Sequence, residues 1–135
     1  MDICDIAQVA ESMETFGARY LDRIYTPHEL ATCLGSPDSA SRLGARFAAK
    51  EAVVKILRPT NANPDWRSIE VRSAADGSCS IVLSGRAEQL AAAAGLSDIA
   101  VSLTHEGAVS AAVVVAISVP EQRTPATKAM ETSHQ

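Results

Sequence analysis

Hydrophobic residues recur with helical and strand periods in an order that predicts a mixed fold. Residues 1–6 are short and mostly apolar, as in a strand. Residues 7–23 then carry apolar side chains at helical spacings, with a break near Gly17. A second helix should begin at Thr26, because Pro27 suits the first helical position and Glu29 completes a capping box. Gly35 should end that helix.

The longest helix is predicted over residues 39–57. Its apolar stripe is formed by Leu43, Phe47, Val54 and Leu57, with many alanines between them. Pro59 should end it, because proline lacks the amide hydrogen that a helix needs.

The second half of the chain predicts strands. Residues 69–72 and 80–83 alternate around Asp76-Gly77, which is a hairpin signal. Ser84 can cap a short helix over residues 85–94. Two further apolar strands, within 99–103 and 109–117, are expected to form the buried centre of an antiparallel sheet.

The length of 135 residues predicts one domain, and 47% hydrophobic residues are enough to build its core. The composition changes after the last predicted strand, where Pro, Glu, Thr, Lys and Ser dominate. We therefore expect a domain over residues 1–118 and a disordered tail over residues 119–135.

The charge balance narrows the choice of partners. Twelve basic and sixteen acidic side chains give a net charge of −4, which argues against a nucleic-acid partner. A small phosphorylated ligand needs only a local basic patch. The longest apolar run, residues 111–117, is far shorter than the roughly 20 residues of a membrane span, so no membrane association is expected.

Three cysteines, Cys4, Cys33 and Cys79, fit neither a disulfide framework nor a zinc site. We expect free thiols and a reducing, cytoplasmic location. The first residues also lack the basic and apolar pattern of a secretion signal.

The predicted long helix carries most of the candidate chemistry. Arg42, Arg46 and Lys50 follow one another at i, i+4 spacing, and Glu51 and Lys55 form a neighbouring ridge. Three stacked cations repel one another, and an anionic ligand would relieve that repulsion. The alternative is a set of surface charges bordering a core stripe.

These residues lie in a recognisable motif. Residues 46–52, RFAAKEA, followed by Lys55, resemble the signature of the phosphopantetheinyl transferases of holo-acyl-carrier-protein-synthase type. Further blocks of that family follow the same order over about residues 1–118. They are Asp5-Ile6, YLDRIYTPHEL at 20–30, WRSIEV at 66–71, ADGS at 75–78 leading to LSG at 83–85, and VSLTHE at 101–106.

The resemblance implies an α+β fold, the 4′-phosphopantetheinyl transferase fold, with an antiparallel sheet and a long central helix. It implies transfer of 4′-phosphopantetheine from coenzyme A to a serine of an apo acyl carrier protein, which gives the holo form and 3′,5′-ADP. It also implies Mg²⁺ on the pyrophosphate and a homotrimer with coenzyme A between subunits. The alternative is a catalytically degenerate relative that only binds a carrier protein or coenzyme A.

The resemblance also assigns roles to individual residues. Asp5 and Glu51 match the two metal carboxylates, a donor set that suits Mg²⁺. Lys55 matches the lysine beside the reacting phosphate, while Arg46 and Lys50 match positions that bind coenzyme A phosphates. Independently of the family, Asp5 is a plausible helix N-cap, and Glu51 is spaced to pair with Lys55.

Other candidates keep two interpretations each. Ser84 and Gly85 open a helix whose amides favour an anion, or Ser84 is only a cap. His105 matches a family position and either contacts a ligand phosphate or accepts the serine proton, unless it merely bonds a neighbour in the hairpin. Glu106 is either a third metal carboxylate or a turn residue.

Three departures from the family pattern affect these expectations. Ile3 stands where relatives have glycine, and Cys79 replaces a proline after the Asp-Gly turn. Glu11, like Glu14, occurs on the first helix where relatives place basic residues that bind acidic carriers. Arg19 and Arg23 remain as candidate carrier contacts, so an acidic carrier should be a poor substrate.

Overall fold

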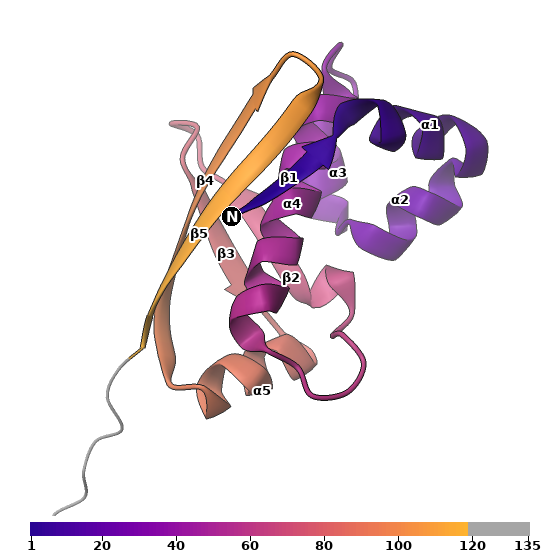
Figure 1. The fold of residues 1–135 in the computed structure, drawn as a ribbon. Helices are drawn as coiled ribbons and strands as arrows, with labels where there is room; N and C mark the ends of the chain where they lie inside the picture. Colours follow the sequence, from indigo (N-terminus) through magenta and orange to yellow (C-terminus); the bar gives the residue numbers. More distant parts are fainter. Residues whose placement is uncertain (119–135) are drawn as a thin grey trace, which may run out of the picture.

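The computed structural model describes residues 1–118, and the predicted tail over residues 119–135 lies outside the described residues. The strands and helices follow the predicted order (Figure 1). They are β1 Asp2–Asp5, α1 Ile6–Phe16, α2 Ala18–Ile24, α3 Pro27–Cys33, α4 Ser39–Leu57, the 3₁₀ turn η1 Trp66–Ser68, β2 Ile69–Ser73, β3 Cys79–Leu83, α5 Gly85–Ala93, β4 Leu96–Glu106 and β5 Val109–Ser118.

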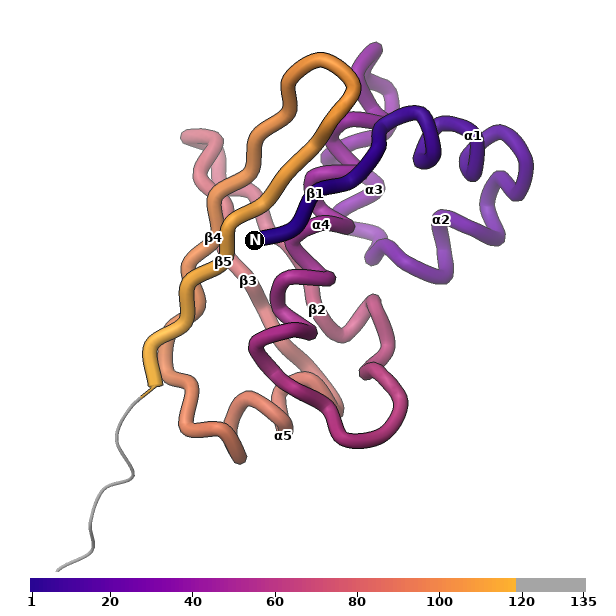
Figure 2. The backbone as a smooth tube through the Cα atoms, viewed as in Figure 1, coloured from indigo at the N-terminus to yellow at the C-terminus, as the bar shows by residue number. Residues whose placement is uncertain are grey.

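The strands form two antiparallel sheets beside the central helix α4. One sheet has the order β1-β5-β4, and the other pairs β2 with β3. Figures 1 and 2 show α1, α2 and α3 gathered at one side and α5 at the far end of the long β4–β5 hairpin. The expected α+β fold with a long central helix is confirmed. Within residues 1–118, no helix is both long enough and apolar enough to cross a membrane.

The β4–β5 pair is less buried than its apolar sequence predicted. One face of β5 packs on α4 and buries Ser110, Ala112 and Val114. On the opposite, outer face, Val115 and Ile117 are more than half exposed. β5 is indeed the central strand of its sheet, but the expectation that both strands are buried is wrong.

Local sequence signals fix the start of α3, which packs on the central helix α4. Thr26 Oγ1 accepts a hydrogen bond from the Glu29 amide, and Glu29 Oε1 accepts one from the Thr26 amide, so the predicted capping box is present. Helix α4 has the predicted bounds. It lies close to β5 at Gly44, where an added Cβ would come within 3.2 Å of Ser110 Oγ.

A buried ion pair joins α3 to α4. Lys50 Nζ lies 2.8 Å from Glu29 Oε1, and both side chains are 0% exposed. Lys50 also donates to the carbonyls of Trp66 and Ile69, at 2.9 and 2.5 Å. Glu29 Oε2 accepts from the Val71 amide at 2.7 Å. Burial lowers the pKa of Lys50, and the charge of Glu29 opposes that shift. The pair therefore connects α3, α4 and β2.

Removing one partner of this pair should strongly destabilise the fold. Lys50→Met leaves the Glu29 carboxylate buried without a counter-charge, so we expect a loss of about 3–5 kcal/mol in the free energy of unfolding. Urea titration followed by circular dichroism measures the change. The matched variant Lys55→Met, at an exposed ion pair, should change stability by less than about 1 kcal/mol. Equal effects of the two variants would contradict this assignment.

Candidate functional site

Helix α4 presents charged side chains on two flanks. Arg46 and Glu51 are five residues apart, which places them about 140° apart around the helix axis. The first group, the carboxylate–lysine cluster, consists of Asp2, Glu51 and Lys55. The second group, the arginine–histidine pocket, contains Asp38, Arg42, Arg46 and His105.

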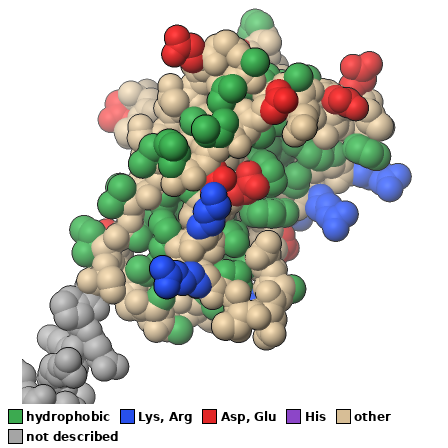
Figure 3. Space-filling model, viewed as in Figure 1, with side chains coloured by type: hydrophobic (Ala, Val, Ile, Leu, Met, Phe, Trp, Pro, Cys, Tyr) green, Lys and Arg blue, Asp and Glu red, His purple; other side chains and the backbone are tan. Residues whose placement is uncertain are grey.

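In the carboxylate–lysine cluster, Lys55 is paired with β1. Its Nζ lies 3.0 Å from Asp2 Oδ1 and 2.9 Å from Asp2 Oδ2. Glu51 is half-buried one helical turn before Lys55. Burial, followed by the charge of Asp2, raises the pKa of Glu51, while Lys55 lowers it. Figure 3 shows acidic and basic side chains meeting in the middle of this face, where β1 and α4 lie in Figure 1.

Asp5 lies at the end of β1 and caps α1. Its Oδ1 accepts a hydrogen bond from the Ala7 amide at 3.0 Å, as expected of an N-cap. That single bond leaves the other carboxylate oxygen for a further ligand. Burial raises the pKa of the adjacent Cys4 thiol, and the charges of Glu51 and Asp5 raise it further. Asp5 is the next residue in the chain after Cys4, and Glu51 comes from α4. As a pair of oxygen donors they fit Mg²⁺, which completes its shell with phosphate and water.

Glu106 is not part of this cluster. It pairs with Val109 across the β4–β5 hairpin and is exposed. Neighbouring strand residues point to opposite faces, so Glu106 lies on the outer face of the sheet while α4 covers the inner face. Asp5 pairs with the same residue, Val109, from β1 and therefore lies on that outer face as well. Within residues 1–118, no three His, Cys, Asp or Glu side chains converge as a metal site. Both interpretations of Glu106, third metal carboxylate and turn residue, therefore stay predictions.

The arginine–histidine pocket lies between the start of α4 and the end of β4. Its volume is about 190 Å³, and Cys79 forms part of its wall. Arg46 is only 5% exposed and donates to the Arg42 carbonyl and to Ser73 Oγ, at 3.1 and 2.9 Å. Its Nε has no hydrogen-bond partner among the described residues. His105 Nε2 lies 3.8 Å from Asp38 Oδ2 at the exposed rim. Two guanidinium groups and an imidazole favour an anionic ligand here.

Two predicted coenzyme A residues do not join this pocket. Lys50 is buried, and its three ammonium hydrogens are matched by Glu29, Trp66 and Ile69, so it is not placed to bind a phosphate. Ser84 and Gly85 open α5, at the opposite end of β4 from His105 (Figure 1). The side chain of Ser84 makes no capping hydrogen bond to α5, contrary to its expected role as a cap.

Two residues of the site escaped the sequence reasoning. Asp2 pairs with Lys55 from 53 residues away, and only the packing of β1 on α4 brings them together. Asp38 directly precedes the predicted long helix and was not identified as a site residue, although it lies beside His105 in the structure. The alternation of β1 places Asp2 on the same side as Cys4, but nothing in the sequence identified α4 as the element facing it.

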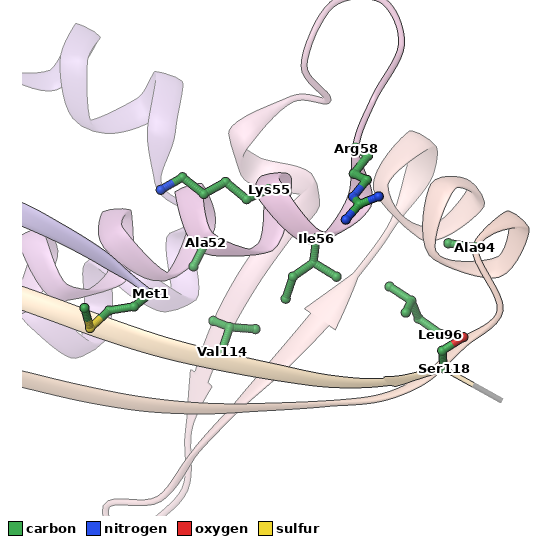
Figure 4. A pocket seen from close by; sticks show the side chains of 9 residues that line it. All are labelled: Met1, Ala52, Lys55, Ile56, Arg58, Ala94, Leu96, Val114 and Ser118. Carbon is green, nitrogen blue, oxygen red and sulfur yellow. The ribbon is translucent and has the colours of Figure 1, made fainter.

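Two larger hollows border the charged groups. A cavity of about 520 Å³ beside Lys55 includes Ile56, Leu96 and Val114 in its wall. Figure 4 shows the aliphatic part of Lys55 along this cavity and its nitrogen pointing away from it. A second hollow, of about 540 Å³, is lined by Phe16, Arg19, Tyr20 and Arg23 of α1 and α2.

Comparison with known proteins identifies the family. The family model described as the 4′-phosphopantetheinyl transferase superfamily matches residues 1–115. This chain belongs to that superfamily. The transferase is 39% identical over 115 residues to the holo-[acyl-carrier-protein] synthase of Moorella thermoacetica, covering 85% of this chain and 89% of the relative. It is 40% identical to the synthase of Dehalococcoides mccartyi, and the match covers 85% of this chain and 93% of that relative.

Solved structures agree with the fold. The transferase matches the acyl carrier protein synthase of Mycobacterium tuberculosis with a TM-score of 0.68 and 32% identity, covering 87% of this chain and 94% of that one. It matches the holo-[acyl-carrier-protein] synthase of Helicobacter pylori, solved in complex with coenzyme A, with a TM-score of 0.74 and 24% identity, covering 86% and 96%. The resemblance to holo-acyl-carrier-protein synthases is therefore confirmed.

The pKa of Glu51 should depend on both of its charged neighbours. In the free protein its carboxyl should titrate above the ordinary range for glutamate, because burial and Asp2 disfavour its ionised form. Asp2→Asn should lower this pKa, and Lys55→Met should raise it. Carboxyl ¹³C NMR titration of the three proteins measures the order. An identical Glu51 pKa in all three would contradict the described cluster.

Proposed function

We propose that this chain is a holo-[acyl-carrier-protein] synthase. It transfers 4′-phosphopantetheine from coenzyme A to a serine of an apo acyl carrier protein and releases 3′,5′-ADP. One observation carries the proposal: α4 presents Glu51 and Lys55 one turn apart beside Asp2 of β1, in a chain that aligns over 85% of its length with holo-[acyl-carrier-protein] synthases.

The reaction requires nearby cations that offset the negative charge of the reacting phosphoryl group. The serine oxygen forms a bond to the phosphorus of the phosphopantetheine group and loses its proton to water, while the bond from that phosphorus to the bridging oxygen breaks and 3′,5′-ADP leaves with that oxygen. We assign Lys55 to the leaving side, where its ammonium offsets the negative charge that develops on 3′,5′-ADP. Its exposure in the free protein, 66%, supports access to a ligand.

We further propose that the reaction depends on Mg²⁺, held by Asp5 and Glu51. When bound, the ion would neutralise charge on the pyrophosphate. Burial and the charge of Asp2 raise the pKa of Glu51, so a cation beside Glu51 would favour its ionised form. The free oxygen of Asp5 is a second donor.

The arginine–histidine pocket is proposed to bind a phosphate of coenzyme A. The Nε of Arg46 is a buried donor that would gain a hydrogen bond from such a ligand. His105 lines the same space as Arg42 and Arg46, which favours phosphate contact over acceptance of the serine proton.

We propose a homotrimer that binds coenzyme A between subunits. The outer face of β1 and β5 supports association, because it exposes an apolar stripe that a neighbouring copy would cover. The stripe consists of Ile3, Val109, Val113, Val115 and Ile117. Within one chain the carboxylate–lysine cluster and the arginine–histidine pocket lie on different flanks of α4. A neighbouring copy would let one coenzyme A contact both groups.

We also propose that the protein works in the cytoplasm. Its three cysteines are free thiols, in agreement with a reducing compartment.

The proposed activity is tested by mass spectrometry of apo carrier proteins incubated with the enzyme, coenzyme A and Mg²⁺. Each modified carrier should gain one phosphopantetheine, and a carrier whose acceptor serine is replaced by alanine should gain none. Binding of coenzyme A without a mass gain in any carrier would instead support a degenerate binding module.

The metal assignment predicts the effect of two conservative substitutions. Asp5→Asn and Glu51→Gln should each weaken Mg²⁺ binding and lower transfer by at least about 100-fold, because losing several kcal/mol of charge stabilisation costs tenfold per 1.36 kcal/mol. Initial rates and calorimetric Mg²⁺ titration measure both effects. Glu88→Gln, the same change at an exposed site on the distant helix α5, is the matched control and should retain activity. The assignment is wrong if Glu51→Gln binds and uses Mg²⁺ normally.

The charge of α1 predicts carrier preference. Glu11 and Glu14 should repel an acidic carrier helix, whereas Arg19 and Arg23 border a hollow that such a helix can contact. Glu11→Arg should therefore raise kcat/KM toward an acidic carrier, and the gain should shrink as salt is added. Glu88→Arg, the same charge change on the distant helix α5, should leave kcat/KM unchanged. Equal gains from the two variants would show that α1 is not the docking surface.

A further inference from the structure

The salt bridge between Asp2 and Lys55 brings an additional residue to the proposed reaction centre. The motif that identifies the family includes Lys55 but assigns no role to Asp2. We propose that Asp2 is a positioning residue, which holds the Lys55 ammonium beside Glu51 for the transfer step. This proposal rests on the role assigned above to Lys55.

The two partners differ in mobility, and Asp2 is the better anchored one. Asp2 lies in β1, where it pairs with Ala112 of β5, and its side chain is only 14% exposed. Lys55 lies in the last turn of α4, and its side chain is 66% exposed. An unpaired lysine at such a place samples many rotamers, and fixing it at the moment of reaction costs conformational entropy. The salt bridge to Asp2 already restricts Lys55 in the free protein, so less conformational entropy is lost when the lysine is fixed for the reaction.

The pairing leaves Lys55 able to bind a second anion. An ammonium group has three hydrogens to donate. Lys50 directs its own hydrogens to Glu29, Trp66 and Ile69 inside the protein. For Lys55, the only recorded partner within residues 1–118 is Asp2. At least one ammonium hydrogen therefore remains for a phosphate oxygen.

The salt bridge to Asp2 also fixes the direction in which the Lys55 ammonium points. The aliphatic stem of Lys55 lies along the cavity formed by Ile56, Leu96 and Val114, and its nitrogen points away from these residues (Figure 4). Asp2 lies on the side toward which the nitrogen points, and its charge also acts on Glu51. Asp2 thus keeps the ammonium on the Glu51 side of α4, close to the proposed metal carboxylates.

Steady-state kinetics of Asp2 variants test this role. Asp2→Asn keeps the size of the side chain but removes its charge, and should lower kcat about tenfold with little change in the KM for coenzyme A. Asp2→Glu should recover part of the loss. Asp98→Asn, an equal change at an exposed site on β4, should have no effect. A normal kcat in Asp2→Asn would overturn the proposal.

A double-mutant cycle separates positioning from a merely structural effect. Lys55→Met alone should abolish most of the transfer. In the Lys55→Met background, Asp2→Asn should cause much less than a tenfold loss, because the ammonium that Asp2 positions is absent. A further tenfold loss in that background would overturn the proposal. If Lys55→Met retained full transfer, the role assigned to Lys55 would itself be wrong.

A readout independent of activity completes the test. The order parameter of the Lys55 Cε methylene, measured by ¹³C NMR relaxation in the free protein, should fall in Asp2→Asn and not in Asp98→Asn. An unchanged order parameter in Asp2→Asn would show that Asp2 does not restrain Lys55.

Discussion

The buried ion pair between Glu29 and Lys50 sets the orientation of α4, and the proposed site depends on that orientation. A charge inside a protein is tolerated only when it is paired and hydrogen-bonded. Here the carboxylate is matched by the Thr26 and Val71 amides and by Lys50, while the ammonium is also matched by two carbonyls. Once Lys50 points inward, helical geometry fixes the direction of every other side chain on α4. Glu51, the next residue, is turned by about 100° toward β1.

This geometry explains how one helix supports two kinds of chemistry. On the β1 side, Glu51 and Lys55 lie near Asp2 of the first strand. On the other side, Arg46 lies against Ser73 of β2, and Arg42 and His105 border the same pocket. Under the proposed function, the first group handles the reacting phosphate and the second binds coenzyme A. The two groups lie on different flanks of one helix. A single coenzyme A therefore contacts both kinds of group only if it reaches around α4, or if one of the two groups belongs to a neighbouring copy. The apolar outer face of β5 supports the neighbouring copy.

Local signals in the sequence were sufficient to predict where the helices and strands lie along the chain, but not which of their residues are buried. The capping box at Thr26 and the bounds of α4 depend on residues within a few positions of one another, and both were predicted correctly. The i, i+4 ridge of Arg42, Arg46 and Lys50 was also correct as a ridge. Lys50, the last residue of this ridge, is buried because it pairs with Glu29 of α3. Residue spacing along one helix cannot reveal a partner on another helix. Strand alternation, by contrast, was available in the sequence: His105 and Glu106 are neighbours in β4 and cannot face the same site.

Mixing two inactive variants tests most directly whether each coenzyme A site is shared between two adjacent copies of the chain. Glu51→Gln disables the carboxylate–lysine cluster, and His105→Ala disables the arginine–histidine pocket. If each coenzyme A contacts both groups from adjacent copies, refolded mixtures should regain transfer in roughly a quarter of the sites, since one interface in four combines two intact halves in a head-to-tail ring. Differently tagged subunits show by co-purification that mixed oligomers have formed. Mixed oligomers with no more transfer than either variant alone would contradict a site shared between copies.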